Sequence, residues 1–367
     1  MTTAGHFYYA NDRRQPIAII GNPGAGISGD IFRLKKILLI AAILIFIILC
    51  GLAVFILDLR QYADQPAGLD TKNMVVDIPS GQTFQATTNI LFKAGIIKSP
   101  FKFNMVARLK GYDKQLKAGE YTLAASMPPI KILEKLVKGE VKLYKLTVPE
   151  GFNIYQIAEL VAQAGFAEQA VFIESATDAA FVREHGIPAE TFEGYLYPET
   201  YYFPKKVNTK TIVSTMVKRF RLVFKPEWGE RGQQLGFSTH QVVTLASIIE
   251  KETGAAFERP LISSVFHNRL KKKMRLESDP TVIYGLKNFD GNLNRKHLET
   301  LTPYNTYKIR ALPPGPISNP GSASLEAALY PAETEYIYFV SKKNNSHQFS
   351  TNFNDHNQAV RKYQLRR

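Results

Sequence analysis

The clearest pattern along the chain is one uninterrupted apolar run near the N-terminus. Ile37 to Leu57 contains 21 residues without a charge or a proline. As a helix it would be about 31 Å long, which matches the hydrocarbon thickness of a bilayer. A cleaved signal peptide would have a shorter apolar segment, closer to the N-terminus, with a small-residue cleavage site after it. The run therefore predicts an uncleaved transmembrane helix.

The charges on either side of this run predict its orientation. The preceding 36 residues carry five basic and two acidic side chains, and the run is followed by Asp58, Arg60 and Asp64. Cytoplasmic flanks are enriched in Lys and Arg, so we expect a cytoplasmic N-terminus and an extracytoplasmic (periplasmic) chain beyond about residue 60. This predicts a protein that crosses the inner (cytoplasmic) membrane once.

Two downstream segments repeat each other. Ile78-Pro79-Ser80-Gly81 and Val148-Pro149-Glu150-Gly151 each follow a β-rich run, and each precedes an amphipathic stretch that ends in glycine, at Gly95 or Gly165. The glycines are 14 residues apart in both copies. The pattern predicts a strand, a Pro-Gly turn and a helix closed by a left-handed glycine.

Each copy also contains a later Gly-aromatic segment that predicts another strand, at Gly119-Glu120-Tyr121 and at Gly194-Tyr195-Leu196. Small βα units of this kind resemble LysM-like glycan-binding modules. A purely structural duplication explains the same pattern equally well.

Further along, a helical pattern carries two glutamates. Ser238 and Gln241 have capping-box spacing, so a helix is predicted to follow Ser238 through THQVVTLASIIEKET. At 100° per residue, Glu250 falls on the flank of the apolar side, where a carboxyl group loses hydration and its neutral, proton-donating form is favoured. Glu252 lies on the opposite flank. Two ordinary exposed glutamates, each paired with a Lys or Arg, are the alternative interpretation.

Together these patterns predict an α+β fold with one N-terminal transmembrane helix. Strand and helix patterns alternate up to about residue 208, and a helix-rich part then leads to a strand pattern at Tyr336–Val340. We expect a flexible cytoplasmic tail over 1–36, the transmembrane helix over 37–57, a linker over 58–72, a LysM-like module over 73–145, and a mixed α/β catalytic domain over 146–367 with the second LysM-like βα element at its start.

Charge and composition narrow the choice of partner and cofactor. The net charge of +14 indicates a negatively charged partner, but the predicted topology places the basic part outside the cytoplasm, which argues against nucleic acid. One cysteine excludes an intramolecular disulfide and a cysteine-based zinc site. Seven histidines without an HExxH pattern predict no metal, and no cofactor is expected.

Several long motifs occur in the C-terminal half: EGYLYPETY from Glu193, LASIIEKET from Leu245, HNRL from His267, SDPTVIYG from Ser278, then YNTY and LPPGPISNPG. In this order they resemble the motifs of the YceG-like (MltG-type) family of endolytic murein transglycosylases, and the resemblance covers roughly residues 37–365. It implies cleavage of the MurNAc-β-1,4-GlcNAc bond within peptidoglycan glycan strands, leaving 1,6-anhydroMurNAc ends. It also implies that Glu250 is the catalytic glutamate, and that the enzyme limits nascent strand length beside penicillin-binding proteins and other wall-synthesis enzymes.

The same motifs supply candidates for sugar contacts, because Tyr can stack on sugar faces and Asn can bond hydroxyl groups. They are Glu193, Tyr197, Asn268, Asp279, Asn305, Tyr307 and Asn319. Ion pairing for Glu193 and turn formation for Asn305, Asn319 and Asp279 are the alternatives. Ser247 is predicted to be a solvated serine on the polar face of its helix, and His267 and His347 to be structural. Glu277 departs from the family, which usually has a neutral residue there, and we expect it to alter substrate contacts without abolishing the chemistry.

Two other functions fit part of this pattern. A non-catalytic, membrane-tethered peptidoglycan adaptor would use the duplicated elements and the basic surface for binding alone. A muramidase would hydrolyse the same bond, but that reaction requires a second carboxylate.

Overall fold

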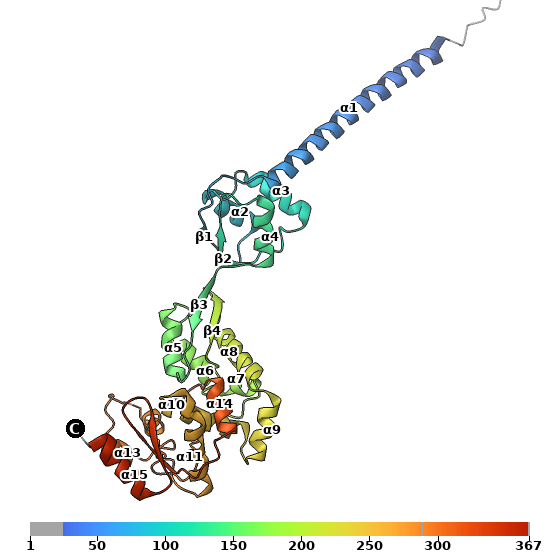
Figure 1. Ribbon diagram of the computed structural model, residues 1–367. Coiled ribbons are helices and arrows are strands. Elements are labelled where there is room, and N and C mark those ends of the chain that lie inside the picture. The colour runs from blue at the N-terminus through green and yellow to red at the C-terminus, as the bar shows by residue number, and fades with distance from the viewer. Residues whose placement is uncertain (1–24, 288, 366–367) are drawn as a thin grey trace, which may run out of the picture.

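The computed structural model describes residues 25–287 and 289–365, so most of the predicted N-terminal tail lies outside the described residues. Its first element is the helix α1, Ala25–Asp64, a rod of about 60 Å that leads into the rest of the chain (Figure 1). The part from Phe32 is long and apolar enough to cross a membrane, with a mean hydropathy of 3.4 in its most apolar stretch and none of that stretch buried.

Helix α1 does not end where the apolar run ends. Phe55, Leu59 and Tyr62 recur at helical spacing and pack against the hydrophobic core of the module that follows. The first part of the predicted linker over 58–72 is therefore helical, because these side chains gain burial by continuing the helix.

The proximal module has the order strand, two helices, strand. Strand β1 (Met74–Ile78) pairs antiparallel with β2 (Gly119–Leu123), with Met74 opposite Leu123 and Ile78 opposite Gly119. Between them lie α2 (Phe84–Lys93) and α3 (Pro100–Lys110), and α4 (Pro129–Lys138) follows β2. The amphipathic α4 buries Ile132, Leu133 and Leu136 in the same core.

A second unit repeats this order with one additional short helix, α7 (Ala179–Glu184). Strand β3 (Leu143–Thr147) pairs antiparallel with β4 (Thr200–Pro204), and α5 (Ile154–Gln163), α6 (Gln169–Thr177) and α7 lie between them. The predicted duplication is confirmed in detail at its glycines. Gly81 and Gly151 have φ of 76° and 75°, and Gly95 and Gly165 both have φ of 70° directly after their helices.

One part of the predicted duplication is wrong. Gly119-Glu120-Tyr121 does start a strand, but Gly194-Tyr195-Leu196 is a buried turn, and the matching strand is β4. Gly194 has φ of 86°, and a Cβ there would lie 2.4 Å from Pro316 Cγ, so tertiary packing requires the turn. Tyr201 is the true counterpart of Tyr121, since each hydroxyl donates a 2.6 Å hydrogen bond to the carbonyl oxygen four residues earlier.

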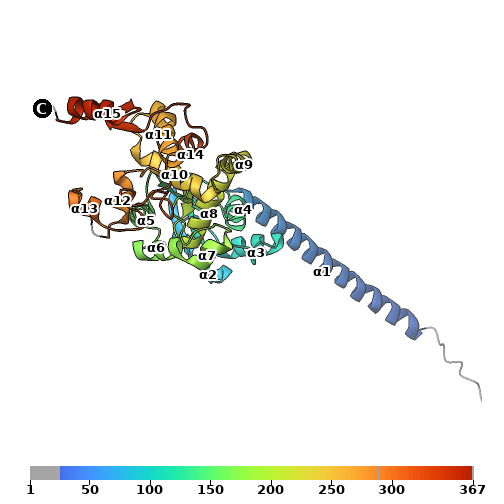
Figure 2. The same cartoon turned by 90° about the horizontal axis from the view of Figure 1, so that it is seen from below.

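The distal part is mainly helical and surrounds α10 (Figure 2). Helix α10 (Thr239–Glu252) packs against α9 (Pro226–Gln234), α11 (Arg259–Lys271), α12 (Asp279–Gly285) and α14 (Ser322–Leu329). The remaining elements are α8 (Thr209–Val223), the 3-10 helix η1 (Ala256–Glu258), α13 (Arg295–Glu299), the antiparallel pair β5 (Tyr338–Ser341) and β6 (His347–Ser350), α15 (Phe353–Val360) and the π-helix η2 (Arg361–Leu365).

The described chain has two separate hydrophobic cores. One contains buried residues from Leu59 to Leu136, and the other contains buried residues from Leu146 to Leu329. The second β-α-α-β unit therefore shares its core with the distal helices, whereas the proximal module has a core of its own. The predicted α+β class is confirmed as a mixture of helices and small two-stranded sheets.

The two cores lead to a prediction about unfolding. Tyr121→Phe removes a hydroxyl group shared by the Lys117 and Leu136 carbonyl oxygens, and Tyr201→Phe removes one that bonds the Tyr197 carbonyl oxygen, so each should cost about 1 kcal/mol. Because the tyrosines lie in different cores, calorimetry of the full chain in detergent should show two transitions, with each variant lowering a different one. Lowering of one common transition by both variants would instead mean that the two cores unfold together.

Candidate active site

The site is built on α10, which begins as predicted. Ser238 accepts a hydrogen bond from the Gln241 N–H, and the Gln241 side chain accepts one from the Ser238 N–H, which forms the capping box. The helix is then buried on all sides from Val242 to Ile249. The prediction of a solvated Ser247 is wrong, because this side chain is fully buried and accepts a 3.0 Å hydrogen bond from the Ile317 N–H. Ser247 thus fixes the LPPGPISNPG segment against α10.

Glu250 lies in the last turn of α10, and its side chain is only 8% exposed. Its Oε2 accepts a 3.0 Å hydrogen bond from the N–H of Gly321, the residue before α14. Its Oε1 lies 3.5 Å from a guanidinium nitrogen of Arg259, the first residue of α11. The starts of two other helices therefore converge on this carboxyl group, and both contacts stabilise its ionised form.

Glu150 is a second carboxylate beside Glu250. It belongs to the Pro-Gly turn of the second β-α-α-β unit, is 48% exposed, and lies 3.9 Å from the same Arg259 nitrogen. Partial burial and the charge of Glu250 raise the pKa of Glu150, whereas Arg259 lowers it. Its carboxyl group lies against Gly321, where a Cβ would be 1.9 Å from Glu150 Oε1.

Sequence reasoning treated Glu150 only as part of a repeated turn and did not consider Arg259. One signal was available for Glu150. The first copy of the turn has Ser80 at this position, so a carboxylate appears only in the copy that reaches the site.

Arg259 is itself held from two sides. Its Nε donates a 3.1 Å hydrogen bond to Ser324 Oγ in α14. The preceding residue, Glu258, is buried and accepts hydrogen bonds from the backbone N–H and the Nδ1 of His347, the latter at 2.7 Å. This arrangement agrees with the structural role predicted for His347. His267 is also placed structurally, 2.8 Å from the Ala328 carbonyl oxygen, and burial lowers its pKa.

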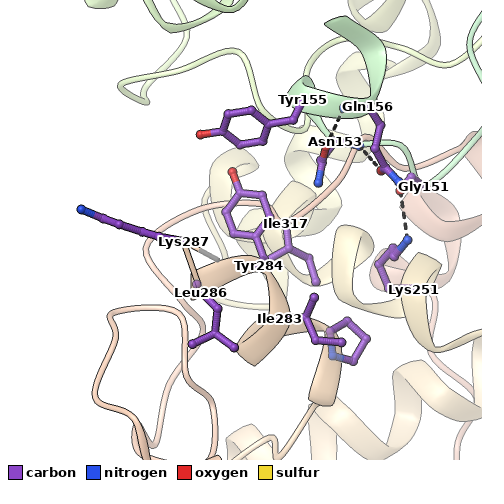
Figure 3. A pocket seen from close by; sticks show the side chains of 12 residues that line it. Gly151, Asn153, Tyr155, Gln156, Lys251, Ile283, Tyr284, Leu286, Lys287 and Ile317 are labelled. Carbon is purple, nitrogen blue, oxygen red and sulfur yellow. Dashed lines mark hydrogen bonds between the residues drawn. The ribbon is translucent and has the colours of Figure 1, made fainter. Parts of the chain in front are cut away.

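A cleft of about 690 Å³ opens next to these groups (Figure 3). One wall comes from the turn and first residues of α5, including Gly151, Asn153 and Tyr155, and the other from α12 and the residues after it, including Tyr284 and Lys287. Lys251 and Ile317 complete the lining. Neither Glu250 nor Glu150 lines the cleft, but their chain neighbours Lys251 and Gly151 do. The two carboxyl groups therefore lie next to the lining, and a Cβ on Gly151 would be 3.4 Å from Glu250 Cγ.

Glu193 lies behind the cleft and does not line it. The side chain is 2% exposed and accepts hydrogen bonds from Tyr284 Oη at 3.1 Å, the Ile154 N–H at 3.1 Å and Asn319 Nδ2 at 2.9 Å. Burial raises the pKa of Glu193 to about 7, even though these three donors act in the opposite direction. Glu193 thus fixes Tyr284 and the start of α5, which form the two walls.

Asn319 is equally buried and joins three segments. Its Nδ2 donates to Glu193 and to the Phe152 carbonyl oxygen, and its Oδ1 accepts a 2.8 Å hydrogen bond from the Leu196 N–H. Because all these partners belong to the protein, the geometry favours a structural role for Asn319, which links the segments around the site.

The other predicted sugar contacts lie apart from this network. Asn305 is buried and bonds the carbonyl oxygens of Leu298 and Thr300. Asn268 bonds the carbonyl oxygens of Thr334 and Tyr336, and Tyr197 stacks under Arg219. The geometry favours structural roles for these three residues, because backbone or side-chain partners within the chain already occupy them.

Asp279 and Tyr307 form a pair near the other end of α12. The Tyr307 hydroxyl donates a 2.7 Å hydrogen bond to Asp279 Oδ1, and Asp279 is exposed. Glu252 accepts a 2.6 Å hydrogen bond from Ser278 Oγ, and burial raises its pKa to about 7. Glu277 faces Arg269 at 3.0 Å, which places its extra charge in an ion pair outside the cleft lining.

The whole arrangement can donate and accept a proton at one end of a cleft with aromatic walls. Within the described residues, no three His, Cys, Asp or Glu side chains are grouped as ligands for a metal ion.

Comparison with known proteins identifies the family of this chain. The model of the YceG-like family matches residues 76–362, which is most of the chain. The chain belongs to the YceG-like family.

Relatives and a solved structure extend this result. A Bacillus subtilis protein named endolytic murein transglycosylase is 35% identical over 82% of this chain and 87% of its own length. A Streptococcus pneumoniae protein of the same name is 29% identical over 79% of this chain, which spans 58% of that longer relative. The crystal structure of a yceG-like protein from Listeria monocytogenes superimposes with a TM-score of 0.54 at 34% identity, and the match covers 78% of this chain and 99% of that one.

The buried Glu193 gives this YceG-like protein a testable dependence of stability on pH. Its pKa is about 7 in the folded chain and near 4.5 when exposed, so the folded state retains a proton that the unfolded state loses between these values. The contribution of Glu193 to stability is therefore full below pH 4.5 and falls as the pH rises to 7.

Glu193→Gln should consequently destabilise the protein more at pH 5 than at pH 8. The loss of unfolding free energy at pH 5 should exceed the loss at pH 8 by about 3 kcal/mol at most. The titration of Glu252 does not affect this difference, because Glu252 is present in both proteins. Calorimetry of both proteins at the two pH values measures this difference. An equal loss at pH 5 and pH 8 would show that Glu193 is ionised throughout.

Proposed function

We propose that this chain is a membrane-anchored endolytic lytic transglycosylase that cleaves the MurNAc-β-1,4-GlcNAc bond within peptidoglycan strands and leaves 1,6-anhydroMurNAc ends. One observation carries the proposal. Glu250, in the helix motif of the family, is a nearly buried carboxyl group held by Arg259 and the Gly321 N–H, and its neighbour Lys251 lines the adjoining cleft. The names of the relatives supply the reaction class.

The geometry suits a reaction that needs a single acid and base. Glu250 would first protonate the glycosidic oxygen and then, as a carboxylate, take the proton from the 6-hydroxyl of the MurNAc sugar as that oxygen attacks C1. Arg259 and the Gly321 N–H stabilise the carboxylate formed in the first step. Because the nucleophile belongs to the same sugar, the attack is intramolecular and no second carboxylate is required.

The cleft next to Glu250 provides the surface for the glycan. Tyr155 and Tyr284 stand on opposite walls, where their rings can pack against sugar faces (Figure 3). Lys251 and Lys287 add positive charge to the lining. These cations suit the lactyl and peptide carboxylates that a peptidoglycan strand carries.

Glu150 would act on the reaction only through the cation that it shares with Glu250. Arg259 lies 3.5 Å from Glu250 Oε1 and 3.9 Å from Glu150 Oε2, so removal of the Glu150 charge leaves Arg259 to Glu250 alone.

The same pair supports a second candidate function. A muramidase needs two carboxylates near the bond, and Glu150 and Glu250 both lie within 4 Å of one guanidinium nitrogen. Glu193, by contrast, is buried behind Tyr284 and has no access to substrate. Hydrolysis would therefore use Glu150, and would give reducing ends in place of anhydro ends.

The rest of the chain fits an anchored enzyme. We propose that α1 crosses the inner membrane with a cytoplasmic N-terminus, in line with the basic residues before it. The β-α-α-β order of the 73–145 module, repeated at the start of the 146–367 catalytic domain, supports a LysM-like role in holding glycan. Work beside penicillin-binding proteins, where cleavage would limit strand length, is part of this proposal.

The first test determines which residue acts as the general acid. Uncrosslinked glycan strands are incubated with the full-length protein in detergent, and the products are identified by mass spectrometry. Wild-type protein should give internal fragments with anhydro ends, and Glu250→Gln should give at least about 100-fold less product, since general acid-base catalysis contributes roughly 10²–10⁴-fold.

Glu252→Gln, two residues along the same helix, is the matched control and should retain most of the activity. Loss of activity in Glu252→Gln alone would identify Glu252 as the general acid and base. Strand binding without cleavage by wild-type protein would favour the adaptor.

The second test concerns Glu150. Partial burial and the charge of Glu250 raise the pKa of Glu150, so its titration changes the charge beside Arg259. Glu150→Gln removes this titration, so the pH–rate profile should change while the product keeps its anhydro end. Gly321→Ala should change the profile as well, because the new Cβ takes the place of the Glu150 carboxyl group.

Glu159→Gln, an exposed glutamate on α5, serves as the control and should leave the profile unchanged. An unchanged pH–rate profile in Glu150→Gln would show that Glu150 takes no part in catalysis. Reducing ends that disappear in this variant would identify the enzyme as a muramidase.

A further inference from the structure

Helix α3 has an apolar stripe on its outer side that nothing in the described chain covers. Phe101 is 63% exposed and Leu109 is 69% exposed, although both are large apolar side chains. They stand eight residues apart on the same side of the helix, and Met105 between them is half-buried against the module core. The opposite face buries Phe103, Val106 and Ala107 in the module core. The exposed stripe formed by Phe101 and Leu109 is therefore apolar surface that the module core does not use.

Contacts with α1 place the first turn of α3 at the end of the predicted transmembrane run. Lys102 Nζ lies 2.7 Å from Asp58 Oδ1, and Asp58 is the residue directly after that run. The Tyr62 hydroxyl donates a 3.0 Å hydrogen bond to the Ser99 carbonyl oxygen. Phe55, inside the run, packs against the module core. A bilayer around residues 37–57 therefore reaches the module, and its surface lies at the level of Ser99–Lys102.

The charges within α3 are all positive. Helix α3 has no acidic residue, and Lys98, Lys102, Arg108 and Lys110 lie within it or shortly before it, with Lys102 paired to Asp58 of α1. An apolar stripe flanked by cations is the pattern of a helix that lies in the interface of a membrane with anionic lipids. Tyr62 adds an aromatic side chain of the kind enriched at this depth.

We propose that the face of α3 that exposes Phe101 and Leu109 is a membrane-docking surface, with Phe101 inserted into the headgroup layer on the outer side of the bilayer that α1 crosses. The bilayer is chosen over a protein partner because the face continues from the span itself and carries the charge that anionic lipids attract. Docking holds the proximal module against the membrane by α1 and α3 together. It thereby limits the distance from the membrane at which the catalytic domain can reach a strand. The inference rests on the proposed membrane span of α1.

Spin labels report the depth of single positions. The native Cys50, the only cysteine in the chain, reports the span itself. In a Cys50→Ser background, Phe101→Cys reports the docking face, and Phe353→Cys reports an exposed apolar position on α15. Each full-length protein is reconstituted in vesicles of phosphatidylcholine and phosphatidylglycerol. Collision with oxygen, which partitions into lipid, is then compared with collision with a water-soluble nickel complex.

We expect the label at position 101 to have a severalfold higher oxygen-to-nickel ratio than the label at 353, and a lower ratio than the label at 50. A ratio at 101 equal to that at 353, with position 50 deep in lipid, overturns the docking while the span stands. A label at 101 that neither reagent reaches also overturns it, because a protein surface then covers the face. A water-like ratio at position 50 overturns the span and the docking together. None of these outcomes depends on the glycan-cleaving activity.

Discussion

The arrangement of the site depends on one cation placed between two carboxylates. Arg259 faces Glu250 from α10 and Glu150 from the turn before α5, and without a shared cation two carboxylates would repel each other at this separation. The guanidinium is fixed because Ser324 accepts its Nε hydrogen and because the adjacent Glu258 is bonded by His347. Glu150 and Ser324, which lie 174 positions apart in the chain, therefore meet at one side chain.

The two walls of the cleft are joined by a different kind of contact. Asn319 bonds the backbone of Phe152 and Leu196 and the side chain of Glu193, and Glu193 in turn holds Tyr284. These polar groups are buried, so any one of them left without a partner would cost the full price of its desolvation. This requirement explains why Asn319 and Glu193, which look like sugar ligands in the sequence, bond other parts of the chain. The side chains that line the cleft instead include two tyrosines and two lysines.

The duplicated units show how a common scaffold acquired different roles. Both have the same strand order, the same left-handed glycines and the same tyrosine hydrogen bond. The first packs around the end of α1 and presents a cationic, apolar helix face, whereas the second shares its core with the distal helices. The turn that carries Ser80 in the first unit carries Glu150 in the second, where it meets Arg259. Position relative to the neighbouring parts decides what each copy can do.

The sequence by itself determined the features that depend on local order: the apolar run of α1, the capped start of α10, the glycine turns and the place of Glu250 in a known motif. Such features follow from periodicity, capping and backbone conformation over a few neighbouring residues. Only the tertiary structure decided that Ser247 is buried, that β4 and not Gly194–Leu196 completes the second unit, and that Arg259 and Glu150 join Glu250. The reason is physical: burial and charge pairing depend on segments distant in the chain, and no local pattern records which segments will meet.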